Sequence, residues 1–157
     1  MKYARLSKEQ FEELHPEFVN FLATQQITAD EWTALKQNKP EVAEQELDIF
    51  SDLIWEGVLN RAKYLQNTSS GQLFLFELGE HAMHLILVKV TDPAVDLSTQ
   101  EGLTWLQQHW NRETVEFFTS SKNYSEEKNK DIFALIRQGG EIVDGSLYRA
   151  LHELLNA

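Results

Sequence analysis

Four acidic side chains recur at intervals of four within one apolar stretch, residues 40–65. On a helix this spacing places them along one slowly drifting surface line, where like charges oppose the helix by roughly a few tenths of a kcal/mol per pair. No Lys or Arg lies between Pro40 and Asn60 to compensate them. We call this set the acidic row: Glu44, Asp48, Asp52 and Glu56.

The acidic row has three interpretations: a solvated helix face, a docking surface for a basic partner, or a divalent-metal site. Oxygen-ligand metal sites usually draw on loops or several elements rather than on one helix. Trp55 borders the row, and an exposed tryptophan among carboxylates would be typical of an interface anchor. The residues predicted to bind a partner are therefore Glu44, Asp48, Asp52, Trp55 and Glu56.

Histidines offer a weaker hypothesis, a metal site built from His81, His84, His109 and Glu113. Zinc requires three or four converging N, O or S ligands. His81 and His84 flank the start of an expected strand, and residues three apart on a strand point to opposite faces. His109 and Glu113 are four apart on an expected helix, but two ligands do not define a site. The sequence therefore assigns no metal.

Motifs of known catalytic machinery are missing from the sequence. It contains no GxSxG, Walker or HExxH pattern. We assign no catalytic residue and no cofactor on this basis, and an enzymatic role stays open.

Composition limits the partners and the compartment. The chain has 157 residues, 42% of them hydrophobic, a formal net charge of -11 and no cysteine. The negative charge argues against direct binding to a nucleic-acid backbone. The lack of cysteine fits a reducing compartment, and no apolar run approaches the roughly 20 residues of a membrane span. We expect a cytoplasmic protein that binds neither nucleic acid nor membrane.

The first half of the sequence has helical periodicity. Capping boxes at Ser7 and Thr28 begin two helical segments, and Pro16 kinks or divides the first of them. Pro40 suits the first turn of a long helix that continues to Leu65. Apolar residues occupy much of the circumference of this helix, so we place it at the centre of the fold.

From Gln72 the apolar period becomes that of strands. Residues 72–79 and 82–90 are apolar runs joined by a short turn, which predicts a β-hairpin. A lone hairpin is marginal in water, so it needs covering helices, a third strand from residues 2–6, or a second copy of the chain. An uncovered hairpin edge would offer backbone groups to that copy and give a homodimer.

These segments together predict one α+β domain, residues 1–157, that is predominantly helical. We expect six or seven helices around the long central helix, with one β-hairpin. The expected parts are a helical half over residues 1–66, the hairpin over 72–90 and C-terminal helices over 98–156.

Two segments resemble a known family. They are KYARLSKEQFEELHPEFVNFLATQQITADEW, residues 2–32, and PEVAEQELDIFSDLIWEGVL, residues 40–59. Both are similar to a small uncharacterised family of Bacteroidetes proteins described as a domain of unknown function. The resemblance implies a bacterial cytoplasmic protein and brings no catalytic residues with it.

Three functions remain open at this stage. The leading hypothesis is a non-catalytic, acidic protein-interaction module that docks a basic protein on the acidic row. One alternative is a metal-dependent or small-molecule enzyme that combines histidines with acidic residues. The other is an immunity-type or nucleic-acid-mimicking inhibitor of a basic partner.

Overall fold

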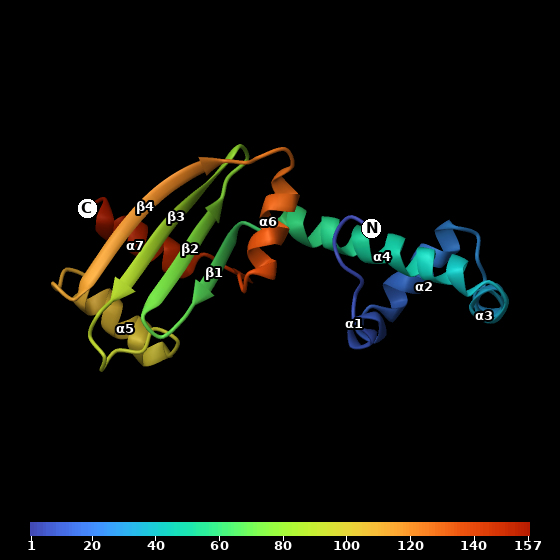
Figure 1. Cartoon of the computed structure of the whole chain (residues 1–157), viewed down its shortest axis with the longest axis horizontal. Helices are drawn as coiled ribbons and strands as arrows, with labels where there is room; N and C mark the ends of the chain where they lie inside the picture. The colour runs from blue at the N-terminus through green and yellow to red at the C-terminus, as the bar shows by residue number, and fades with distance from the viewer. The chain divides into compact units, whose positions relative to one another are not determined.

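The computed structural model describes all 157 residues, which form two compact units, Met1–Asn60 and Arg61–Ala157 (Figure 1). The first unit contains α1 (Lys8–Glu13), α2 (His15–Thr24), α3 (Ala29–Asn38) and nearly all of α4 (Pro40–Arg61). The second contains β1 (Tyr64–Thr68), β2 (Gln72–Leu78), β3 (Ala82–Val90), α5 (Gln100–His109), β4 (Val115–Asn123), α6 (Lys128–Arg137), β5 (Glu141–Val143) and α7 (Ser146–Leu155).

The helix starts of the first unit follow their capping residues. Ser7 Oγ accepts from the Gln10 amide and Gln10 Oε1 accepts from the Ser7 amide, so the predicted capping box is confirmed. Pro16 lies in the first turn of α2, where a missing amide hydrogen costs nothing. The segment around Pro16 is therefore two abutting helices, one of the two arrangements that we predicted.

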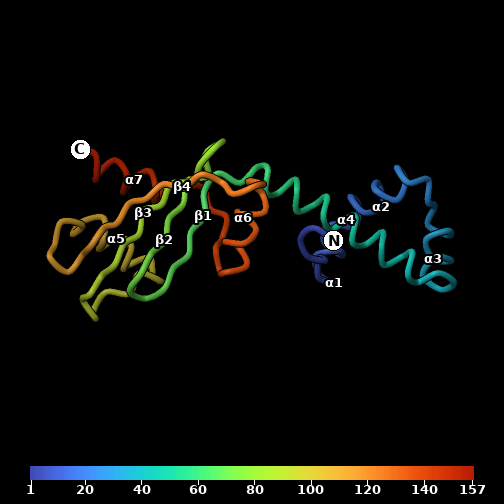
Figure 2. Tube along the Cα trace, turned by 45° about the horizontal axis from the view of Figure 1, so that its top comes forward, coloured from blue at the N-terminus to red at the C-terminus, as the bar shows by residue number.

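An aromatic cluster holds the first unit together. The Phe50 ring of α4 lies 5.1 Å from Phe18 and 5.4 Å from Phe21, centroid to centroid. Leu6 and Leu22 join these rings as buried members of the cluster. Figure 2 shows α1, α2 and α3 gathered along α4, which is how residues far apart in sequence reach one cluster.

We placed α4 at the centre of the whole fold because of its broad apolar face, but it belongs to the first unit and part of that face is exposed. Ile49 and Leu53 are 48% and 56% exposed, although both belong to its apolar positions. The aromatic cluster covers the side that carries Phe50, and α4 presents Ile49 and Leu53 to solvent. The breadth of the apolar stripe therefore overstated how many neighbours the helix has.

The second unit is built on a five-stranded antiparallel sheet with the order β4-β3-β2-β1-β5. Leu73 and Leu75 of β2 and Ile86 and Val88 of β3 point to one face, where they pack with residues of α5 and α7. We call this the inner face. On the other side the carbonyl that ends α6, Gln138 O, accepts from Asn67 Nδ2 of β1 at 3.3 Å.

The predicted fold class is wrong in its β content: the chain is α+β, but it has a whole sheet where we expected one hairpin. The hairpin of β2 and β3 is confirmed. We extended the long helix to Leu65, because Val58, Ala62 and Leu65 follow one another at helical steps, whereas α4 ends at Arg61 and β1 begins at Tyr64. Residues 2–6 form no strand.

The most consequential error in the predicted fold was that β4 was missed. We placed residues 98–121 among the C-terminal helices, as one piece or as two divided at Asn111, whereas α5 ends at His109 and turns lead into β4. Leu106, Trp110 and Phe117 fit a helical period by chance, because the polar end of the strand offers no apolar residue to break it. None of the helices is both long enough and apolar enough to cross a bilayer.

Candidate functional site

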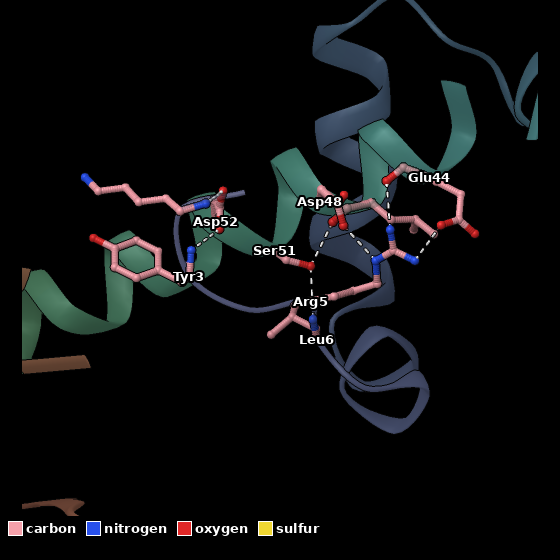
Figure 3. Close-up of polar contacts among 9 residues, drawn as sticks. Tyr3, Arg5, Leu6, Glu44, Asp48, Ser51 and Asp52 are labelled. Atoms are coloured by element: carbon pink, nitrogen blue, oxygen red, sulfur yellow. Dashed lines mark hydrogen bonds and ion pairs between the residues drawn. The ribbon is translucent and has the colours of Figure 1, made fainter. Parts of the chain in front are cut away.

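The acidic row lies on α4 beside residues 2–6, which we call the N-terminal segment (Figure 3). The two backbone amides of Lys2 and Tyr3 donate to the two carboxylate oxygens of Asp52, at 2.7 and 2.9 Å. An ionised carboxylate that accepts backbone amides forms a charge-assisted bond, stronger than a neutral one. Asp52 therefore fixes the direction in which the segment runs along the helix.

Arg5 joins the other half of the acidic row to the N-terminal segment. Its Nε donates to Asp48 Oδ1 at 2.7 Å, and its Nη1 donates to Glu44 Oε2 at 2.9 Å. These carboxylates hold the pKa of the Arg5 guanidinium above its ordinary value through their hydrogen bonds. One planar guanidinium thus bridges two successive acids of the row.

Tyr3 and Lys2 both reach Glu56 at the far end of the acidic row. The Tyr3 hydroxyl donates to Glu56 Oε2 at 2.7 Å, and Lys2 Nζ lies 3.3 Å from the same oxygen. Burial, followed by the hydrogen bond to Glu56, raises the pKa of Tyr3 to about 12. The phenol therefore stays a donor throughout the neutral range.

Leu6 attaches the end of the N-terminal segment to the aromatic cluster. Its side chain is 7% exposed among Phe18, Phe21 and Phe50. Its amide donates to Ser51 Oγ at 3.1 Å, and Ser51 in turn donates to Leu47 O within α4. The segment is thus held by charge along its length and by apolar burial at its end.

All four acids of the row therefore have partners within the chain, which the sequence-based argument did not foresee. The helix itself contains no compensating cation before Asn60, and the compensating groups lie 39 to 54 residues earlier in the chain. Trp55 is partly buried against the aromatic cluster. Partner binding by these residues stays a prediction, and any partner would compete with the N-terminal segment.

The four residues of the metal hypothesis lie in separate environments. His81 is 88% exposed beside Glu80. His109 stacks on Trp105 at 4.8 Å and ends α5, so Glu113 lies in the following turns rather than on the same helix. No group of three or more His, Cys, Asp or Glu side chains is placed to hold a metal ion.

His84 has a neighbour that sequence reasoning missed. Its Nδ1 lies 2.6 Å from Ser121 Oγ, and Glu77 is its cross-strand neighbour on the other side. These residues line a pocket of about 450 Å³ with the last turn of α7, including His152 and Asn156. The carbonyl end of a helix disfavours an oxyanion, so the pocket is poorly suited to acyl transfer by Ser121.

The edges of the sheet differ greatly in length. β5 pairs through three residues, whereas β4 is a nine-residue strand with no neighbour on its far side (Figure 1). Both strands of the hairpin are interior, because β1 pairs with β2 and β4 pairs with β3. The hairpin itself thus has no open edge.

Alternation along β4 shows which backbone groups are directed outward. At one end of the strand the Thr91 amide donates to Thr114 O, and at the other end the Tyr124 amide donates to His81 O. The backbone groups of the even-numbered residues of β4 therefore bond with β3. Because antiparallel ladders alternate, the amides of the odd-numbered residues point away from the sheet: Phe117, Thr119, Ser121 and Asn123. We call these the open amides.

The sheet face opposite the inner face is partly apolar beside β4. Phe118 is 49% exposed, and the partly buried Leu87 lies opposite it on β3. Lys89 Nζ lies 5.3 Å from the centroid of the Phe118 ring. An open strand next to an exposed aromatic side chain has the features of a surface that binds another protein.

A model of a family of unknown function, DUF6495, matches residues 1–156. The chain belongs to this family. Its membership of a family without an assigned function was predicted and is confirmed, whereas the Bacteroidetes origin stays a prediction. Neither a curated protein nor a solved structure matches the chain, so the site must be interpreted from its own geometry.

Proposed function

We propose that this member of the DUF6495 family is a non-catalytic protein-association module that binds a strand of another polypeptide along β4. The observation that supports the proposal is the open edge of this nine-residue strand. Backbone pairing supplies affinity in such β-augmentation, and side chains on alternate faces supply specificity. Natural sheets usually shorten or cover their edges, as β5 is shortened here.

A photo-crosslinking amino acid at Ser121, in cells that naturally make the protein, tests this proposal. We expect a covalent adduct that is lost when Thr119→Pro is added, because proline removes an open amide without touching the bonds to β3. The matched control places the crosslinker at the exposed Ser69, in the turn between β1 and β2, where no adduct should form. The absence of any Thr119-dependent adduct at Ser121 would contradict the proposal.

The acidic row supports a second proposal, that α4 docks an extended basic peptide in place of the N-terminal segment. The segment itself demonstrates the ligand chemistry: two amides on Asp52, a guanidinium across Asp48 and Glu44, and an apolar residue at the end. A partner with the same features would have to displace it.

A chain carrying Tyr3→Phe and Arg5→Ala tests the second proposal, because its own segment is held less tightly. A free peptide of sequence Lys-Tyr-Ala-Arg-Leu should bind this variant at least about 10-fold more tightly than it binds the unaltered chain, with a glutamate-for-arginine peptide as control. If the peptide bound both chains equally, or bound neither detectably, the proposal of docking at the acidic row would be wrong.

A further inference from the structure

We infer that the strand bound by β4 is the β4 of a second copy, paired antiparallel about Thr119 to continue one sheet through a homodimer. This inference rests on the proposed function and names its partner. Figure 1 shows β4 at the edge of the sheet, and no strand of the chain pairs with its far side.

The backbone permits this pairing. Residue 119 is odd-numbered, so its amide and carbonyl point outward and can exchange two hydrogen bonds with Thr119 of the copy. Phe117 and Ser121 then form the next hydrogen-bonded pair, in both directions from the two-fold axis. The register spans the strand Val115–Asn123, whose ends are equidistant from residue 119. Its open amides are those of Phe117, Thr119, Ser121 and Asn123, because the Val115 amide donates to Arg112 O.

The side chains select this register. Glu116 and Lys122 are also equidistant from Thr119, so each Glu116 faces the Lys122 of the other copy. Both occupy positions without backbone bonds to the copy, where facing residues approach most closely, with Cα atoms about 4.5 Å apart. Centring the pair on Phe118 or Ser120 shortens the ladder and separates both charges from their partners.

Neither charged residue is committed to another strong partner. Glu116 lies opposite Lys89 of β3, and the charge of Lys122 helps to lower the pKa of Asp131 from a distance. Neither Glu116 nor Lys122 makes a salt bridge within the chain. A C2 interface needs a self-complementary patch. A strand with opposite charges placed symmetrically about its centre meets that requirement with a single sequence.

Charge reversal tests the register in a way that folding defects cannot imitate. Glu116→Lys and Lys122→Glu each put like charges opposite one another twice per dimer, so each alone should raise the dimer Kd by about 10-fold or more. The double variant restores both opposite pairs and should regain the dimer. Mixing the two single variants should give a heterodimer, because every facing pair is again of opposite sign.

Sedimentation velocity of the full chain over a range of concentrations measures these states, with Thr119→Val as a control that keeps the backbone amide. Thr119→Pro should raise the dimer Kd by about 100-fold. A chain that stays monomeric at every concentration, or single variants whose mixture gives no heterodimer, overturns the homodimer. The proposed function would survive that result if the crosslink at Ser121 captured a different protein, and would fail separately if no adduct formed.

Discussion

The two units treat their polar groups in opposite ways. In Met1–Asn60 the conspicuous charges of the acidic row are paired by the N-terminal segment. In Arg61–Ala157 the inconspicuous strand β4 leaves a line of backbone amides directed away from its sheet. A charged pattern in a sequence therefore says little about whether its side chains are free to bind a partner. That depends on which other segments the fold places beside them.

The largest expected effect is in the first unit, at Leu6, which anchors the N-terminal segment. Leu6→Ala removes a buried side chain from the aromatic cluster and should lower the unfolding free energy of the first unit by about 2–5 kcal/mol. Denaturant unfolding with hydrogen exchange at α2 and α4 measures the loss. Val19→Ala, at a 48% exposed position of α2, is the matched control and should change stability by no more than about 0.5 kcal/mol. Equal effects of the two variants would show that the segment is not anchored.

Much of this arrangement could be predicted from local sequence, and the rest depends on distant contacts. Capping residues located α1 and α3, and apolar runs located β2 and β3. β4 was missed because Leu106, Trp110 and Phe117 fit a helical period, and because the strand is polar from Ser120 onward. The alternation of Val115, Phe117 and Thr119 after the helix end at His109 was the available signal.

The candidate sites show the same division. The spacing of the acidic row correctly placed its four residues on one helix. The pairing of this row with the N-terminal segment could not be predicted, because residues 2–6 have no periodicity that links them to α4. The pairing of His84 with Ser121 was equally hidden, since it requires the strand that we missed.

A smaller effect is expected at Asp52. Asp52→Ala leaves the amides of Lys2 and Tyr3 without their acceptor and should cost about 1–3 kcal/mol. Gln45→Ala, at an exposed position of the same helix, controls for helix propensity. Chemical denaturation of the three chains gives the comparison. If Asp52→Ala matches Gln45→Ala, the row is a solvated face and the contrast between the units is lost.

The smallest effect is a pH dependence from Tyr3. Its pKa rises from 10.0 to about 12 on folding, mainly through burial and then through Glu56. A raised folded pKa contributes stability that is complete below pH 10 and is lost as the pH rises toward 12. The unaltered chain should therefore lose more stability than Tyr3→Phe between pH 9 and about 11.5 in thermal unfolding. Parallel curves would mean that folding does not raise the pKa of the Tyr3 phenol.

One measurement tests both halves of the comparison together: amide hydrogen exchange of the full chain, resolved by residue, at low and high protein concentration. Protection of Phe117, Thr119 and Ser121 should rise with concentration, because a second copy covers the open amides. Protection of Lys2, Tyr3 and Leu6 should be unchanged, because Asp52 and Ser51 bind them within the chain. Fast exchange in β4 at every concentration, or in the N-terminal segment at any, would contradict the account.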